Sequence, residues 1–103
     1  NPISQARCYR RAALNAMKMY SYAQGEQTAR ARRSVIQNML DSIDSTMTPK
    51  EAADMQQRML QEQASLQNEQ MRMQVLRWKF EEEEKLLKMQ HQAELDRLFF
   101  EAQ

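Results

Sequence analysis

Few residues of this sequence could do chemistry, and their spacing does not assemble a catalytic or metal site. His91 and Glu94 lie three positions apart, which places both on one face of a helix. A zinc site needs at least three protein ligands, and Lys88 occupies the position where a Glu-x-x-His carboxylate would stand. Cys8 has no histidine near it in sequence, and no Gly-rich phosphate-binding loop is present. We therefore predict no enzymatic activity, no metal and no cofactor.

The element that must position most of these side chains is a long amphipathic helix, expected from Thr48 to about Ala102. Thr48 can cap the first turn, Pro49 needs no N–H there, and Glu51 can complete a capping box. No Gly or Pro follows as far as Gln103. At 1.5 Å per residue, roughly 54 residues would span about 80 Å, so this helix needs partners along its length.

A seam of apolar residues indicates where that helix packs. It repeats at an interval of seven: Ala52, Met59, Leu66, Met73, Phe80 and Leu87. The companion positions are only partly apolar: Met55 and Leu76 fit the pattern, whereas Glu62, Glu69, Glu83 and Gln90 do not. A simple parallel zipper is therefore not expected.

Two denser apolar patches on the long helix face several directions at once, so we expect each to contact more than one neighbouring helix. We predict that the first, residues 71–80, packs on a further helix or a neighbouring copy, and that the second, residues 95–100, makes an oligomer or partner contact. The alternative for both is core packing in the full-length protein. The predicted interface residues are Met71, Val75, Leu76, Trp78, Phe80, Leu95, Leu98, Phe99 and Phe100.

The sequence pattern in the first half of the chain predicts further helical segments. Residues 1–24 form a helical appendage or an irregular segment, and residues 25–103 an antiparallel hairpin, with Gly25 as a break or a soft spot. In the hairpin, Arg30 and Arg33 are expected level with the acidic residues of 62–69. One face of the appendage is interpreted as core packing: Ala6, Tyr9, Ala13, Ala16, Met17 and Tyr20.

Composition supports an all-α class: an elongated helical hairpin or bundle with one very long C-terminal helix and a short N-terminal helical appendage. The chain has 103 residues, one Gly and two Pro, and 42% of its residues are hydrophobic. Its net charge of +1 favours protein partners over direct nucleic-acid binding. The first residue is Asn rather than Met, so we expect a processed or truncated chain, and Cys8 is either free or paired outside it.

Residues 44–53, 55–58 and 62–70, together with 32–40, resemble the minor pilin family of type IV secretion systems, and within it the conjugation proteins of the TraC and TrwJ type. The resemblance covers roughly residues 22–89 and rests on the spacing of Gln, Glu, Asn and Leu. Trp78, Phe80 and the aromatic residues near the C-terminus are not part of it.

The resemblance implies a periplasmic, pilus-associated or cell-surface protein that is built as an elongated helical bundle with a smaller appendage. Its implied partners are copies of itself, the polytopic inner-membrane channel subunit, the major pilin and the recipient-cell surface. Its implied role is pilus assembly, adhesion and DNA or effector transfer, at the pilus tip or in the stalk. The long N-terminal helix of the family is expected to lie outside these residues. The alternative is an intracellular coiled-coil scaffold or adaptor that binds partner helices.

Overall fold

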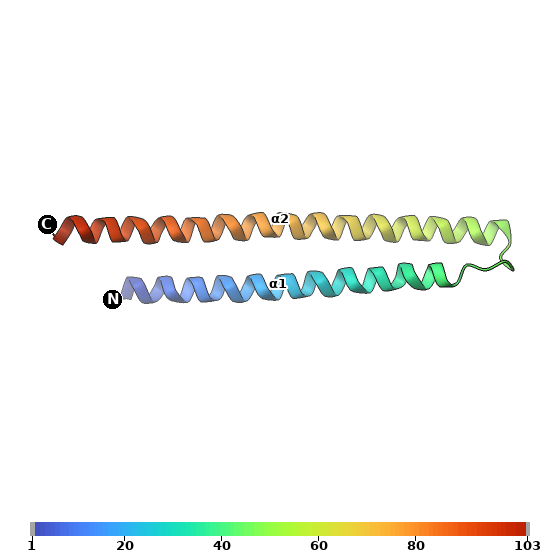
Figure 1. Ribbon diagram of the computed structural model, residues 1–103, viewed down its shortest axis with the longest axis horizontal. Coiled ribbons are helices and arrows are strands. Elements are labelled where there is room, and N and C mark those ends of the chain that lie inside the picture. The colour runs from blue at the N-terminus through green and yellow to red at the C-terminus, as the bar shows by residue number, and fades with distance from the viewer. Residues whose placement is uncertain (1, 103) are drawn as a thin grey trace. The chain divides into compact units, whose positions relative to one another are not determined.

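The computed structural model describes residues 2–102, and nearly all of them lie in two α-helices (Figure 1). Helix α1 spans Pro2–Asp41 and helix α2 spans Pro49–Ala102. No strand occurs among residues 2–102. The predicted all-α class and the long C-terminal helix are confirmed, and the predicted N-terminal appendage is helical as the first part of α1.

The chain divides into two compact units, and each helix contributes a segment to both. Unit 1 comprises Asn1–Ser21 and Val75–Gln103, and unit 2 comprises Tyr22–Gln74. In unit 2 the end of α1 and the start of α2 form the antiparallel hairpin that the sequence predicts (Figure 1). The domain boundary after residue 24 stays a prediction, and its outer limits, residues 1 and 103, lie outside the described residues.

The connection in unit 2 is held by local hydrogen bonds. The Asp44 carboxylate accepts hydrogen bonds from the Thr46 amide at 2.8 Å and from the Thr46 hydroxyl at 2.5 Å. These bonds lower the pKa of Asp44, because they stabilise its charged form. The Thr48 hydroxyl accepts a hydrogen bond from the Glu51 amide at 3.2 Å, so the predicted cap at the start of α2 is confirmed.

Gly25 does not interrupt α1, although its position allowed a break. It is buried in unit 2, where the side chain of Met73 from α2 occupies the space beside it. A Cβ atom on Gly25 would lie 2.1 Å from the Met73 sulfur, far inside van der Waals contact. The helix therefore continues through a glycine whose missing side chain admits a methionine from the other helix.

The predicted heptad seam is the face that α2 turns toward α1. In unit 2, Met59, Leu66 and Met73 are half-buried, and in unit 1 Phe80 and Leu87 are buried, whereas Ala52 is exposed. The buried apolar residues in the described part of the chain are Ala29, Phe80 and Leu87. So small a core leaves many large apolar side chains in contact with solvent.

One detail of the predicted charge pairing is wrong. Arg30 and Arg33 pair with Glu26 on their own helix, at 3.8 and 3.2 Å, and not with the acidic residues of α2. Arg32 instead makes the contact between helices in unit 2, with Glu62 at 3.4 Å. The reason is the seam of α1, which runs through Gly25, Ala29, Arg32 and Ile36 at alternating steps of four and three residues: Arg32 is half-buried on it, whereas Arg30 and Arg33 are exposed.

Candidate protein interface

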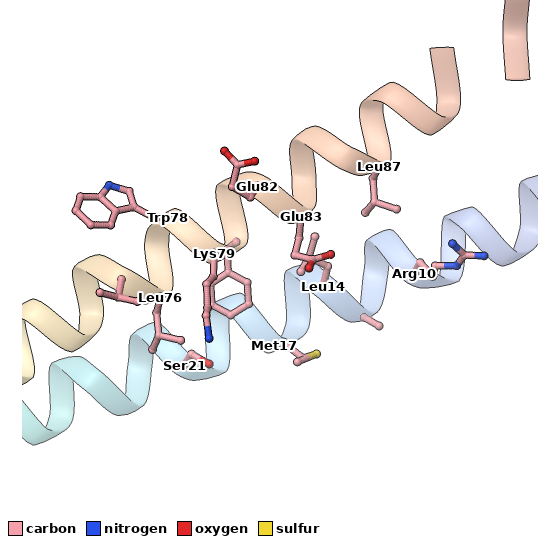
Figure 2. Close-up of a pocket in the computed structure, with 13 residues that line it drawn as sticks. Arg10, Leu14, Met17, Ser21, Leu76, Trp78, Lys79, Glu82, Glu83 and Leu87 are labelled. Carbon is pink, nitrogen blue, oxygen red and sulfur yellow. The ribbon is translucent and has the colours of Figure 1, made fainter. Parts of the chain in front are cut away.

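A groove runs along unit 1 between the first part of α1 and the second part of α2 (Figure 2). Its volume is about 840 Å³, within the usual range for ligand sites. We call it the unit 1 groove. Its lining is mainly apolar and comprises Ala13, Leu14, Met17, Val75, Leu76, Trp78, Phe80 and Leu87, with Arg10, Ser21, Lys79, Glu82 and Glu83 as the polar members.

The helical step decides which groove residues form its floor and which its walls. Phe80 and Leu87 belong to the heptad seam, and both are buried, with 7% and 8% of their surface exposed. Val75 and Trp78 lie away from the seam and are exposed, Trp78 by 58%, and Figure 2 shows Trp78 pointing away from α1. The groove thus has a fixed apolar floor and an accessible aromatic wall.

A second apolar surface lies near the end of α2. We call Leu95, Leu98, Phe99 and Phe100 the C-terminal end; all four are exposed. The rings of Phe99 and Phe100 meet edge to face, with centroids 6.4 Å apart and an interplanar angle of 78°. Phe99 is 65% exposed and Phe100 is 74% exposed, so this surface is open for contact.

Comparison with known proteins identifies the family of this chain. The family model of type IV secretion system proteins matches residues 1–92, most of the chain. The chain belongs to the type IV secretion system protein family. No curated protein and no solved structure matches it.

The family match contains the whole unit 1 groove and stops before the C-terminal end of this type IV secretion system protein. Family membership indicates an envelope or extracellular location. Neither helix, over residues 2–102, is long and apolar enough to cross a membrane.

The structure brings four of the nine predicted interface residues into the groove: Val75, Leu76, Trp78 and Phe80. Phe80 is buried within its own unit, so it supports the groove rather than offering a free contact surface. Met71 is exposed in unit 2 and does not line the groove. The other four predicted residues form the C-terminal end.

The prediction that one apolar face in the first part of α1 packs in the core is wrong for the large residues of that face. Tyr9, Met17 and Tyr20 are exposed, whereas the neighbouring Leu14 is half-buried in the groove. The amphipathic stripe of α1 was read from apolar residues alone. The position of α2 selects a different face, which includes the charged Lys18.

Ion pairs join the two helical segments of unit 1. Arg7 pairs with Glu94, and its guanidinium donates a hydrogen bond to His91 Nδ1 at 3.1 Å. Lys18 pairs with Glu84. His91 and Glu94 thus share one face as predicted, and there they bind an arginine. Across residues 2–102, the structure contains no group of three or more metal-ligating side chains.

Cys8 lies closer to His91 than the sequence suggested. Both line a pocket of about 180 Å³ in unit 1, with Ser4, Arg7 and Arg11. The thiol is free and exposed. The two residues are 83 positions apart in the sequence, so their proximity follows only from the antiparallel pairing of α1 with α2. His91 Nδ1 accepts the hydrogen bond from Arg7, so this nitrogen is engaged in the ion-pair network rather than directed at the thiol.

Proposed function

We propose that this protein is a minor pilin of the TraC and TrwJ type, a structural component of the pilus with no chemistry of its own. Family membership establishes that the protein belongs to a type IV secretion system. The finer assignment is supported by the resemblance of residues 22–89 to that group. In this proposal the protein is periplasmic or pilus-associated, at the tip or in the stalk, and supports pilus assembly, adhesion and DNA or effector transfer.

The observation that carries the proposal is the exposed apolar surface of unit 1. Trp78 on the groove wall and Phe99 and Phe100 at the C-terminal end are large aromatic residues that the chain leaves in solvent. Aromatic residues are enriched in protein interfaces, and Trp is among the residue types that most often dominate the binding energy. Exposed methionines, such as Met17 in the groove, adapt to partners of different shape.

The partners that we propose are assembly components: further copies of this protein, the major pilin and the polytopic inner-membrane channel subunit, with the recipient-cell surface as a contact of the finished pilus. Long helices suit such a role, because apolar faces that they do not cover for each other are available to neighbouring helices.

Complementation of a deletion strain tests the proposal. The full-length gene with Trp78→Ser or with Phe99→Ser/Phe100→Ser should give normal protein levels but few pili and little transfer. Tyr9→Ser is the matched control, because Tyr9 is as exposed as Phe100 and lies outside both surfaces. Wild-type pili and transfer in both variants would contradict the proposal.

A further inference from the structure

We propose that unit 1 binds a phosphate group on the other side of its helix–helix seam from the unit 1 groove. Two pockets of about 180 and 280 Å³ lie there, and Arg11 from α1 lines both of them. Leu14 and Leu87 line the larger pocket and also the groove, so these two seam residues separate the two sides. We call the surface around Arg11, Lys88 and His91 the Arg11 site.

The first part of α1 brings only positive charge to this site. Residues 2–25 contain four cationic side chains and no Asp or Glu. Three of the four, Arg7, Arg11 and Lys18, are spaced four and seven residues apart and therefore share one face of α1. Arg7 and Arg11 repel each other at this spacing, so negative charge beside this face stabilises it.

Helix α2 compensates two of these cations and leaves the third. Arg7 pairs with Glu94, and Lys18 pairs with Glu84. Arg7 and Lys18 are half-buried, whereas Arg11 is exposed. Arg11 makes no ion pair with any other residue of the described chain, residues 2–102. The two carboxylates that reach this side are thus engaged, and Arg11 keeps an uncompensated charge.

A second uncompensated cation, on α2, lies beside Arg11. Lys88 is exposed, lines the larger pocket together with Arg11 and, over residues 2–102, also has no ion pair. Glu84 stands one turn before Lys88, but its carboxylate is engaged by Lys18. An anion that binds between the two unpaired cations relieves their repulsion, and the positive potential of the surface attracts it.

His91 adds a hydrogen-bond donor in a defined position. An arginine side chain can only donate, so the 3.1 Å contact between the Arg7 guanidinium and His91 Nδ1 makes this nitrogen an acceptor. The neutral imidazole then carries its proton on Nε2, which is a donor. His91 lines the smaller pocket with Arg11 and with Ser4, whose hydroxyl can donate as well.

The number and kind of donors favour a phosphate group among the anions. Arg11 offers a planar fork of N–H groups, and Lys88 offers a point charge. A carboxylate has only two oxygens, whereas the three or four oxygens of a phosphate group can meet donors that come from two helices. Both pockets are smaller than the about 300 Å³ at which sites for whole small molecules usually begin, so they suit a single group of this size.

Two sources supply that chemistry to an envelope or extracellular protein: free phosphate and the headgroup of an anionic phospholipid. Both present the same oxygens to the Arg11 site. The inference concerns a side of unit 1 that the proposed function does not use. It therefore goes beyond the minor pilin assignment and does not depend on it.

Titration of the full-length protein with inorganic phosphate, followed by nuclear magnetic resonance, tests the inference. Ionic strength and pH are held constant, with sodium chloride as the balancing salt. The ring signals of His91 and the guanidinium signals of Arg11 should shift with phosphate concentration and saturate. The same range of sodium chloride alone should give no saturable shift. A wild-type protein that shows no saturable shift with phosphate and binds no phospholipid would overturn the inference.

Variants of equal charge separate a site from general attraction. Arg11→Gln and Lys88→Gln should each weaken phosphate binding about tenfold or more, because each removes a charged donor. Arg10→Gln and Lys85→Gln remove the same charge from exposed positions that line neither pocket, and salt screens such charges, so binding should change by less than about twofold. The circular dichroism of all four variants should match wild type. Control variants that bind as weakly as the site variants would contradict the inference.

Co-sedimentation with phosphatidylglycerol vesicles distinguishes the two sources. Vesicle binding that Arg11→Gln weakens about tenfold and Arg10→Gln leaves intact would identify the headgroup as the ligand. Saturable binding of free phosphate without binding to vesicles would identify a soluble phosphate. Vesicle binding that falls equally in both variants, with no saturable response to phosphate, would overturn the inference. That result would leave the proposed function standing, because the proposed function depends on Trp78 and on the C-terminal end.

Discussion

The close contact between Gly25 and Met73 makes a quantitative prediction about the hairpin of unit 2. Alanine is favoured over glycine in a helix interior by about 1 kcal/mol, so Gly25→Ala would normally stabilise α1. Here the added Cβ would lie 2.1 Å from the Met73 sulfur, 2.6 Å from its Cε and 2.9 Å from its Cγ. Rotating the terminal methyl group (Cε) of Met73 away does not relieve the contact, because Met73 Cγ is also too close to the added Cβ.

Overpacking of this kind costs about 1 to 3 kcal/mol, which exceeds the gain in helix propensity. Gly25→Ala should therefore lower the free energy of unfolding by about 1 kcal/mol. When Met73→Ala has removed the obstructing side chain, the same substitution should raise it by up to about 1 kcal/mol. The effect of one methyl group should change sign with the residue opposite.

Urea denaturation of the four proteins, followed by far-ultraviolet circular dichroism, measures this double-mutant cycle. The coupling energy between the two positions should be about 1 to 3 kcal/mol. Gly25→Ala that stabilises the otherwise unchanged protein, or that has the same effect in both backgrounds, would refute the reasoning.

Three further predictions concern the remaining contacts. Leu87→Ala should lower the free energy of unfolding by about 2 kcal/mol or more, whereas Leu86→Ala, next to it but exposed, should change it by less than about 0.5 kcal/mol. Thr48→Ala should cost about 1 kcal/mol in the same assay by removing the cap of α2. The lowered pKa of Asp44 means that its contribution is present above its ordinary value of 3.8 and is lost as pH falls through the folded-state value, so Asp44→Asn should flatten the acid limb of a stability profile. If Asp44→Asn lost stability as steeply as the wild type when the pH falls, this role of Asp44 would be contradicted.

Sequence alone could predict the features that depend on local pattern. The start of α2 follows from a capping residue before a proline, and its buried face from a seven-residue repeat that ends in Phe80 and Leu87. The exposed C-terminal end follows from adjacent aromatic residues that no single helix face can bury. These inferences need no knowledge of the opposing helix.

The features that sequence could not give depend on how the two helices pair. The pattern around Gly25 suggested a break in α1. That Gly25 makes room for the Met73 side chain is evident only from the packing of α2 against α1. The choice of Arg32 over its neighbours as the contact to Glu62, and the shared pocket of Cys8 and His91, have the same origin. The antiparallel register sets all three, and the heptad pattern of one helix does not specify that register.

The groove combines both kinds of feature. Its α2 side was predictable from Val75, Leu76 and Trp78, which crowd one stretch of the helix. Its α1 side was not, because Met17 belongs to a stripe that suggested core packing yet lies exposed at the surface. A signal was present in retrospect: α1 has more apolar residues than one neighbouring helix can cover.

The most direct test of the central claim is the location of the full-length protein in cells that also express its neighbouring genes. Fractionation and immunoblotting should recover it in the periplasm and in pili sheared from the cell surface. Recovery in the cytoplasm alone would contradict a minor pilin role, and an intracellular helical scaffold would then be the better explanation of the same exposed surfaces.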